Sequence, residues 1–259
     1  MLTCYFVDAF AERPFEGNPA AVCVLERWPE DALLQNIAIE HNLSETAYVV
    51  KTARGWHLRW FTPGGEVDLC GHATLGTAFA LSRFVELDAQ EFLFETMSGD
   101  LRVQRKEDKF YMDFPAYDLK SVPVTEAMEQ AIGCRPLEAW MGRDLLLVLP
   151  DAEAVENCRP DQALLAELPG LITHITAPGR DGDDCTSRSF APKLAIAEDP
   201  VCGSGHCHIA PYWGKRLGKE EIVAWQASRR GGRLWCSLRG ERVTLGGRAV
   251  AYAKSEIYL

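Results

Sequence analysis

The feature that most constrains the fold of this chain is an internal repeat. The motif Arg-x-Phe-x-Pro occurs at residues 59–63 and again at residues 188–192. A Cys-Gly pair follows each copy and opens an apolar segment, first as Cys-Gly-His at 70–72 and then as Cys-Gly-Ser at 202–204. A solenoid of fixed period needs more than two copies. The repeat therefore indicates two similar domains from a duplication, and it predicts that the two Cys-Gly turns face each other across one cleft.

The rest of the chain is typical of short strands with a few helices. Apolar residues at helical spacing predict helices over residues 29–42 and 72–84, and a further apolar segment begins at Gly205. Short runs of alternating or β-branched residues predict strands elsewhere. Residues 121–171 predict two weak helices around a strand at 144–149. The pattern is α+β, with one central helical segment in each half.

The composition is that of an ordinary globular protein and narrows the possible partners. Hydrophobic residues make up 47% and charged residues 25% of the 259 positions. A net charge of −10 disfavours nucleic acid and anionic membranes as partners, because both attract a basic surface. No apolar run approaches the roughly 20 residues of a membrane span, and we expect no secretory signal at the start. Nine scattered cysteines, an odd number, favour reduced thiols in a cytoplasmic protein.

The two Cys-Gly turns have the chemistry of an anion site. Each lies where a strand region ends and a helix begins, and the first N–H groups of a helix lack partners at its positive end. Glycine lets a ligand approach the backbone closely, so two such starts would hold a carboxylate and stabilise negative charge during proton removal. A thiol there, Cys70 or Cys202, would have a lowered pKa and could act as a base. Each cysteine taken alone is also compatible with simple packing.

The residues after the second turn also raise a metal hypothesis. Cys202, His206, Cys207 and His208 are possible zinc ligands, but the spacing is C-x4-C rather than two residues between ligands. On a helix, His206 and Cys207 would point about 100° apart. We therefore expect no metal, and supporting or packing roles for Cys207 and His208.

Two further stretches place polar residues beside apolar strands. Glu45 follows Ser44 and enters an apolar strand, where burial would raise the pKa of its carboxyl group toward a useful acid/base range. A solvated turn or a helix cap is the competing interpretation of Glu45. Asn18 lies in a turn before a strand, either as a turn former or as a polar contact for a substrate. The sequence has no GxGxxG, phosphate-loop, GxSxG or HExxH motif.

Four stretches together resemble the PhzF-like isomerases of phenazine biosynthesis, which are relatives of diaminopimelate epimerase and proline racemase. They are VDAFAERPFEGNPAAV at 7–22, NLSETAYV at 42–49, RWFTPGGEVDLCGHATLGTAFAL at 59–81 and RSFAPKLAIAEDPVCGSGHC at 188–207. The resemblance implies an α+β fold of two pseudo-symmetric domains, each a curled mixed β-sheet wrapped around a central α-helix.

The same resemblance implies the domain limits and the assembly. The N-terminal domain would hold residues 1–115 with about 249–259, and the C-terminal domain residues 116–248. A homodimer is implied, with no metal and no organic cofactor.

The resemblance also implies roles for single residues. Glu45 matches the acid/base carboxylate of the family, while His72 and Asp199 match polar residues in the cleft between the domains that support proton transfer. The reaction would move a proton within a small anionic substrate, amino-acid-like or cyclic, and shift a double bond. The residues that would bind this substrate lie in or beside the turns: Asn18, Ser44, Gly71, Gly203, Ser204 and Gly205.

Two alternative functions remain open. In the epimerase and racemase relatives, two cysteines form the base/acid pair at the positions of Cys70 and Cys202, whereas PhzF-like sequences usually carry threonine at the second position. This chain has both cysteines, which keeps a two-cysteine racemase or epimerase open. His72 stands where those relatives have asparagine, and it favours the PhzF-like hypothesis. The second alternative is a non-catalytic family member that binds a small molecule or a protein.

Overall fold

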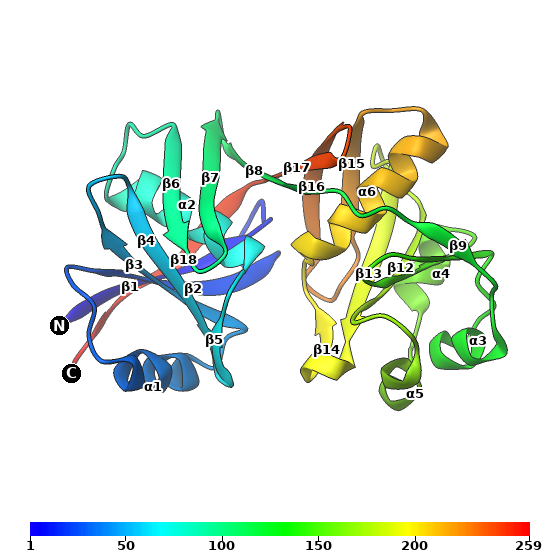
Figure 1. Cartoon of the computed structure of the whole chain (residues 1–259), viewed down its shortest axis with the longest axis horizontal. Coiled ribbons are helices and arrows are strands. Elements are labelled where there is room, and N and C mark those ends of the chain that lie inside the picture. The colour runs from blue at the N-terminus through cyan, green and yellow to red at the C-terminus, as the bar shows by residue number, and fades with distance from the viewer. The chain divides into compact units, whose positions relative to one another are not determined.

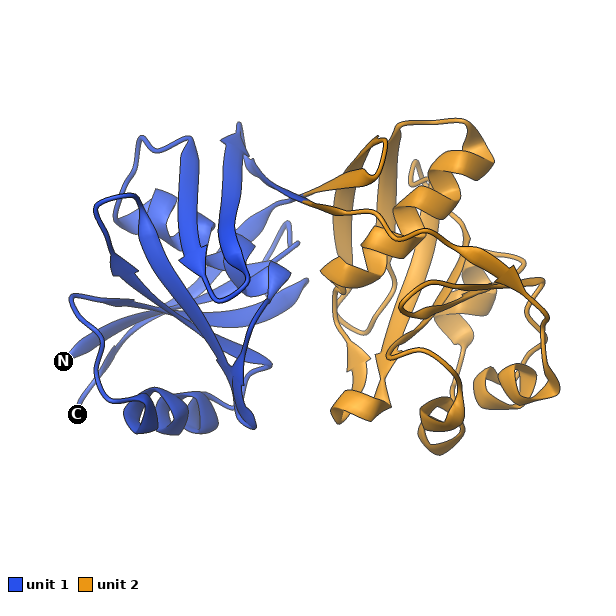
Figure 2. Cartoon of the chain, viewed as in Figure 1, with its two compact units in different colours: residues 1–113, 246–259 blue, residues 114–245 orange.

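A computed structural model describes all 259 residues, which form two compact units. Unit 1 consists of residues 1–113 and 246–259, and unit 2 of residues 114–245 (Figure 2). The expected boundaries at 115 and 249 lie two and three residues from these limits. None of the helices has the length and apolar character that crossing a membrane requires.

Unit 1 is a β-sheet with two helices, α1 (Asp31–His41) and α2 (Gly71–Phe84) (Figure 1). Its strands are β1 (Leu2–Ala9), β2 (Asn18–Leu25), β3 (Glu45–Lys51), β4 (Trp56–Thr62), β5 (Gly65–Val67), β6 (Glu91–Thr96), β7 (Gly99–Lys106), β8 (Lys109–Pro115) and β18 (Ala249–Ile257).

The sheet of unit 1 curls around helix α2. The strands pair in the order β18-β1-β2-β3-β4-β6-β7-β8, with β5 beside β4. The β2–β3 and β4–β6 pairs are parallel and the others antiparallel, so the sheet is mixed. Helix α2 contacts β1, β2 and β3 in the middle of this order and also β18 and β7 near its two ends. A flat sheet could not reach one helix from both ends, and ten of the fourteen residues of α2 are accordingly buried.

Unit 2 has more helix, but most of it is in short segments. Its helices are α3 (Glu126–Ile132), α4 (Ala152–Asn157), α5 (Gln162–Glu167) and α6 (Gly203–Leu217), with a 3₁₀ turn η1 (Pro192–Leu194). Its strands are β9 (Lys120–Val122), β10 (Glu138–Met141), β11 (Leu145–Val148), β12 (Thr173–Pro178), β13 (Cys185–Ala191), β14 (Ile196–Asp199), β15 (Glu221–Gln226), β16 (Gly232–Arg239) and β17 (Arg242–Gly247).

The two units repeat one strand pattern. In unit 2 the strands pair in the order β9-β10-β11-β12-β13-β15-β16, with β14 beside β13. The parallel pairs β2–β3 and β4–β6 of unit 1 have their counterparts in β11–β12 and β13–β15. Helix α6 corresponds to α2, because each follows a short antiparallel strand and precedes a strand that pairs in parallel. The structure thus shows the expected fold class, a duplicated α+β architecture with a central helix in each unit.

The register of the strands matches as well. Thr46 of β3 pairs with Phe61 of β4, and Thr173 of β12 pairs with Phe190 of β13. Phe61 and Phe190 are the phenylalanines of the two Arg-x-Phe-x-Pro motifs. Every position in one unit can therefore be compared with a position in the other by counting from these two pairs.

The repeated motif builds the same ion pair in each unit. The arginine and phenylalanine are two residues apart, so they lie on one face of the strand. The Nε and Nη2 of Arg59 lie 2.6 and 2.7 Å from the two carboxylate oxygens of Glu66, and its guanidinium lies 5.1 Å from the centre of the motif phenylalanine ring. Arg188 repeats this with Glu198, at 2.7 and 2.9 Å, and lies 5.0 Å from its phenylalanine ring. The motif is therefore a structural brace that joins a strand to its short antiparallel neighbour.

Residues 121–171 contain three helices rather than the expected two. Each is only six or seven residues long, too short for a clear apolar periodicity. Each begins at a residue whose side chain accepts a hydrogen bond from the first turn, namely Thr125, Asp151 and Asp161. The expectation was wrong because these helices are specified by their caps rather than by periodicity.

The burial of Arg188 leads to a prediction about stability. Its side chain is 10% exposed and also donates to the carbonyl oxygens of Val155 and Cys158 at 3.2 and 2.8 Å. Arg188→Met would remove these hydrogen bonds and leave the carboxylate of Glu198 without the guanidinium that it pairs with. We expect the free energy of unfolding of the chain to fall by about 3–5 kcal/mol in urea titrations followed by tryptophan fluorescence.

Arg180 provides the matched control for this prediction. It contacts Glu156 at 2.6 Å, but its side chain is 56% exposed. Arg180→Met should therefore cost less than about 1 kcal/mol, because surface ion pairs contribute little. Equal losses in the two variants would show that burial does not decide the strength of the repeated brace.

Candidate active site

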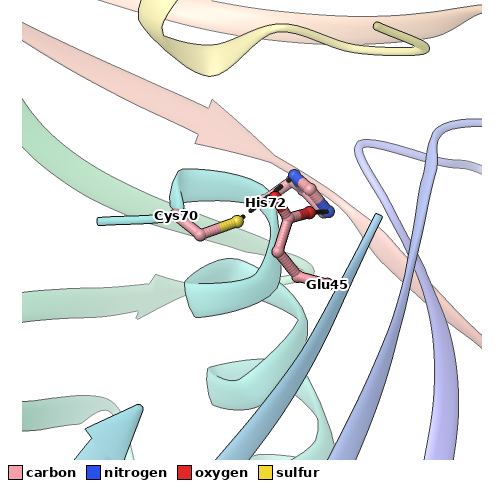
Figure 3. A group of neighbouring side chains, drawn as sticks. All are labelled: Glu45, Cys70 and His72. Carbon is pink, nitrogen blue, oxygen red and sulfur yellow. Dashed lines mark hydrogen bonds and ion pairs between the residues drawn. The ribbon is translucent and has the colours of Figure 1, made fainter. Parts of the chain in front are cut away.

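Three of the expected site residues come together in unit 1 at the start of helix α2. Glu45 is the first residue of strand β3, Cys70 is the N-cap of α2, and His72 lies in its first turn. Because α2 packs against β3, the carboxylate of Glu45 reaches the helix start, as Figure 3 shows.

His72 lies between the other two side chains. Its Nε2 is 3.1 Å from Oε2 of Glu45, and its Nδ1 is 3.5 Å from Sγ of Cys70 (Figure 3). The side chains of His72 and Glu45 are only 9% and 14% exposed. Nε2 and Oε2 have no other protein partner, so each atom depends on the other.

The surroundings set the charge of this pair. Burial raises the pKa of Glu45, but the adjacent His72 and the Cys70 thiol outweigh burial and lower that pKa below its usual value. For His72, burial lowers the pKa, and the acidic groups of Cys70 and Glu45 more than compensate and raise it well above its usual value. The pair is therefore a carboxylate and an imidazolium at neutral pH. The expectation of a raised pKa for Glu45 was wrong, because the sequence does not show that a histidine lies beside it.

The ion pair stabilises unit 1 over a definite pH range. The contribution of Glu45 is present above the usual pKa of 4.5 and is lost as the pH falls through the lower folded-state value. The contribution of His72 is present below the usual pKa of 6.5 and is lost as the pH rises through the higher folded-state value. Both contributions are therefore complete between pH 4.5 and 6.5.

The two candidate thiols differ from expectation. Burial and the charge of Glu45 raise the pKa of Cys70, and burial and Asp199 raise the pKa of Cys202 well above its usual value. A lowered pKa was expected because each thiol lies at a helix start. That expectation was wrong, because both side chains are buried and the loss of water outweighs the helix dipole.

The second Cys-Gly turn, in unit 2, has no carboxylate at the position of Glu45 and no histidine two residues after its cysteine. The Sγ of Cys202 accepts the N–H of Gly205 at 3.3 Å and lies 3.5 Å from Oγ of Ser204. The amide side chain of Gln226 fixes the turn, since it accepts the N–H of Cys202 at 2.8 Å and donates to the carbonyl oxygen of Asp199 at 2.7 Å.

The register explains why the turns differ. Glu45 directly precedes Thr46, and the residue directly before Thr173 in unit 2 is Ile172. An isoleucine therefore stands where unit 1 has its carboxylate. The second residue after the cysteine also differs, because it is His72 in unit 1 and Ser204 in unit 2.

The other expected residues lie close to these turns in their own units. Asn18 is the first residue of β2, is buried, and is two residues from Ala20, which pairs with Glu45. Ser44 is half-buried immediately before β3. Gly71 and Gly203 are the first residues of helices α2 and α6. That the groups of the two units act on one substrate stays a prediction.

The suspected zinc ligands after Cys202 do not converge. The side chains of His206, Cys207 and His208 each lie at hydrogen-bonding distance from the backbone carbonyl oxygen four residues earlier, at 2.8, 3.7 and 3.1 Å. Each ring or thiol is thus directed at a different carbonyl oxygen around the start of helix α6 rather than toward a common point.

Sequence reasoning missed a second buried polar cluster, in unit 2. Asp144, His174 and His208 are completely buried, and Arg143 pairs with Asp144 at 2.6 Å. His174 Nε2 is 3.3 Å and His208 Nδ1 is 3.8 Å from Oδ2 of Asp144. An Arg-Asp pair directly before the apolar run LLLVL was the available signal, but the two histidines come from distant segments.

Two groups of side chains have the ligand types of a metal site. They are Glu45 with Cys70 and His72, and Asp144 with His174 and His208. In the second group a guanidinium already occupies the carboxylate oxygen that would bind the ion. A positive charge at that position opposes a cation, so the second group is poorly suited to a metal.

The chain is similar over nearly its whole length to proteins of one family. The family described as "Phenazine biosynthesis-like protein" matches residues 7–255. An uncharacterized isomerase of Pseudomonas aeruginosa is 49% identical over 254 residues, which are 98% of this chain and 97% of that protein. The phenazine biosynthesis-like domain-containing protein of Homo sapiens is 38% identical over 284 residues, with 96% of each chain covered.

Solved structures agree with the sequence comparison. A crystal structure of a PhzF-family phenazine biosynthesis protein from Enterococcus faecalis matches with a TM-score of 0.97 and 49% identity, covering 100% of this chain and 99% of that one. A hydroxyproline epimerase from Agrobacterium vitis matches with a TM-score of 0.64 at 12% identity, covering 99% and 90%. The second match shows a likeness of fold alone.

The ion pair between Glu45 and His72 leads to a prediction that needs no substrate. Glu45→Gln removes the negative charge while His72 stays buried, so the pKa of His72 should fall. The measurement is an NMR titration of the His72 ring protons. As a control at fixed pH, the chemical shifts of the ring protons of His57, which is hydrogen-bonded to Trp28 in the same unit, should be the same in the variant and the wild-type protein. An unchanged pKa of His72 in the variant would contradict the ion pair.

Proposed function

Because the chain belongs to the phenazine biosynthesis-like isomerase family, we propose that it moves a proton between two positions of a small anionic metabolite without a cofactor. The observation that carries this proposal is the buried pair of Glu45 and His72 at the start of α2. A carboxylate and an imidazolium held 3.1 Å apart and nearly sealed from water form a base and an acid ready for use together.

In the proposed reaction Glu45 is the base. Its lowered pKa keeps the carboxylate ionised at neutral pH, so it can accept a proton from a carbon atom of the substrate. The electron pair of the broken C–H bond stays on the substrate. The imidazolium of His72 and the first N–H groups of α2 stabilise the resulting negative charge.

His72 returns the proton. Its raised pKa makes it an imidazolium that can donate to a second carbon of the substrate, which completes the isomerisation. Glu45 is then protonated and His72 is neutral. Transfer of one proton across their 3.1 Å contact restores the starting pair, so protons and charge balance over the cycle.

In unit 2, we assign anion binding to the second Cys-Gly turn. Ser204 and the backbone at Gly203 and Gly205 lie in the first turn of α6, a fifteen-residue helix whose positive end favours a carboxylate. Asp199 supports this turn through the hydrogen bond from Gln226. With this anion site, we propose an amino-acid-like or cyclic carboxylate as the substrate. The homodimer and the cytoplasmic location stay predictions.

The two-cysteine racemase is the weaker hypothesis. It needs one thiol as a thiolate, but burial raises the pKa of both Cys70 and Cys202. A thiol that holds its proton at neutral pH is a poor base. The pair of Glu45 and His72 also has no counterpart at the equivalent positions of unit 2, which are Ile172 and Ser204, whereas a racemase of two equivalent thiols would not require the pair.

The main prediction concerns Glu45. We expect Glu45→Gln to lower, by at least about a hundredfold, the rate at which deuterium from heavy water enters a substrate found by screening small cyclic carboxylates. The chain should fold as before, and the exposed Glu40→Gln on helix α1 should exchange at the wild-type rate. Wild-type exchange in Glu45→Gln would disprove the role of Glu45. If the wild-type protein exchanged no proton on any compound, the binding-module hypothesis would be favoured.

A second variant separates the proposal from the racemase. We expect Cys202→Ala to keep the rate within about tenfold of wild type, whereas a catalytic thiol would lose about 10²–10⁴-fold. Cys236→Ala is the packing control, because that cysteine is equally buried, on strand β16. A loss in Cys202→Ala far beyond the loss in Cys236→Ala would favour the racemase.

A further inference from the structure

The buried cluster behind the second turn has no role in the reaction proposed above. Its centre is Asp144, a fully buried residue in the connection between β10 and β11. Burial raises the pKa of Asp144, but hydrogen bonds and charges of His174 and Arg143 outweigh burial and place that pKa well below its usual value. Asp144 is therefore a buried anion, which needs fixed partners.

Both ring nitrogens of each histidine in the cluster have protein partners. The backbone N–H of Asp144 donates to Nε2 of His208 at 3.3 Å, so the ring proton of His208 is on Nδ1, where it donates to the carbonyl oxygen of Ser204 at 3.1 Å. The Nε2 of His174 lies 3.3 Å from Oδ2 of Asp144, and its Nδ1 lies 2.9 Å from Oγ of Ser189. No ring nitrogen remains for a ligand.

This network fixes one exposed group, the guanidinium of Arg143. Its Nε lies 3.1 Å from Oδ1 of Asp144, and its Nη2 lies 2.6 Å from Oδ2. The Nη2 also donates to Oγ of Ser204 at 3.1 Å. The guanidinium lies 5.2 Å from the centre of the Tyr117 ring, which in turn stacks on His208 at 4.1 Å.

Helix α6 holds Tyr117 in this position. Pro211 lies inside the helix and has no N–H group, so the carbonyl oxygen of Cys207 lacks its usual partner. The backbone N–H of Tyr117 donates to that oxygen at 2.9 Å. Arg143 is therefore placed by a carboxylate, a hydroxyl group and an aromatic ring, although its side chain is 37% exposed.

The donors that remain are directed away from the network. Asp144 and Ser204 use Nε and Nη2 of Arg143, and no protein acceptor contacts Nη1. The Oγ of Ser204 accepts from Arg143, and the only other side-chain partner of this hydroxyl group is the thiol of Cys202 at 3.5 Å, a weak acceptor that a carboxylate can replace. A guanidinium N–H pair beside a hydroxyl group at the start of α6 matches the two oxygens of a carboxylate.

We propose that Arg143 is a substrate-binding residue that, together with Ser204, binds a carboxylate group of the substrate. Asp144, His174 and His208 are positioning residues that hold the guanidinium at this turn. The inference rests on the proposed function, because that proposal assigns anion binding to the turn containing Ser204. The inference goes further because it names Arg143 as the residue that favours a carboxylate over an uncharged group of the same shape.

The test measures binding and not turnover, so it is independent of Glu45. The probes are benzoate and benzamide, which have the same ring but differ in charge, and calorimetry gives their dissociation constants. We expect the wild-type protein to bind benzoate at least about tenfold more tightly than benzamide, and Arg143→Met to lose this difference. Arg135→Met, in an exposed arginine that pairs with Glu129 at 3.0 Å, should keep it.

Two further variants separate binding from folding. Arg143→Lys keeps the charge but not the planar fork, so benzoate binding should weaken less than in Arg143→Met. Asp144→Asn should weaken the binding of benzoate but not of benzamide, because it loosens Arg143 without changing the rest of the turn. Equal binding of the two probes by the wild-type protein would overturn the inference, as would unchanged benzoate binding in Arg143→Met. If either result were found while Glu45→Gln still lost deuterium exchange, the inference about Arg143 would fail, and the proposed function would still be supported.

Discussion

A helix that is buried on nearly every side brings its unsatisfied first N–H groups into the protein, and each unit is built around such a helix. The start of α2 has no side-chain cap, and the cap of α6 is only the weakly accepting thiol of Cys202. Both starts therefore lack strong internal acceptors and favour an external or neighbouring anion. In unit 1 the carboxylate of Glu45 already lies close to this end, which adds to the reasons for its ionised state.

The duplicated scaffold has diverged in where it places its charges. Counting along the paired strands equates Glu45 with Ile172, and it equates Asp144 with Ala20 of the first unit. Each unit thus has one buried acid near its helix start, but the acids occupy neighbouring strands. The acid of unit 1 faces a histidine with a raised pKa, while that of unit 2 is neutralised by Arg143. One arrangement is ready for proton transfer and the other presents a fixed cation.

The sequence predicted the features that contiguous residues determine. It missed the features that depend on residues far apart in the chain. The Arg-x-Phe-x-Pro repeat and the Cys-Gly helix starts are contiguous patterns, and the duplicated fold follows from them. The cluster of Asp144, His174 and His208 joins three separate segments, so no contiguous sequence motif predicts it. The pKa of Glu45 shows the same limit, because its direction is set by a histidine 27 residues further along the chain. Burial was foreseen correctly, but the partner that reverses the effect of burial was not.

The lowered pKa of Glu45 has a consequence for how the proposed reaction proceeds. A carboxylate stabilised by an imidazolium is a weaker base than one buried alone, so the ground state of the pair works against proton removal. When Glu45 takes the proton, however, its negative charge passes to the substrate. His72 then faces the substrate anion in place of the carboxylate, and the site keeps one positive and one negative charge until His72 donates its proton. In this step the negative charge moves from Glu45 to the substrate within a nearly dry site, and no new charge is created there. The imidazolium of His72, which makes Glu45 a weaker base, therefore also stabilises the substrate anion that Glu45 produces.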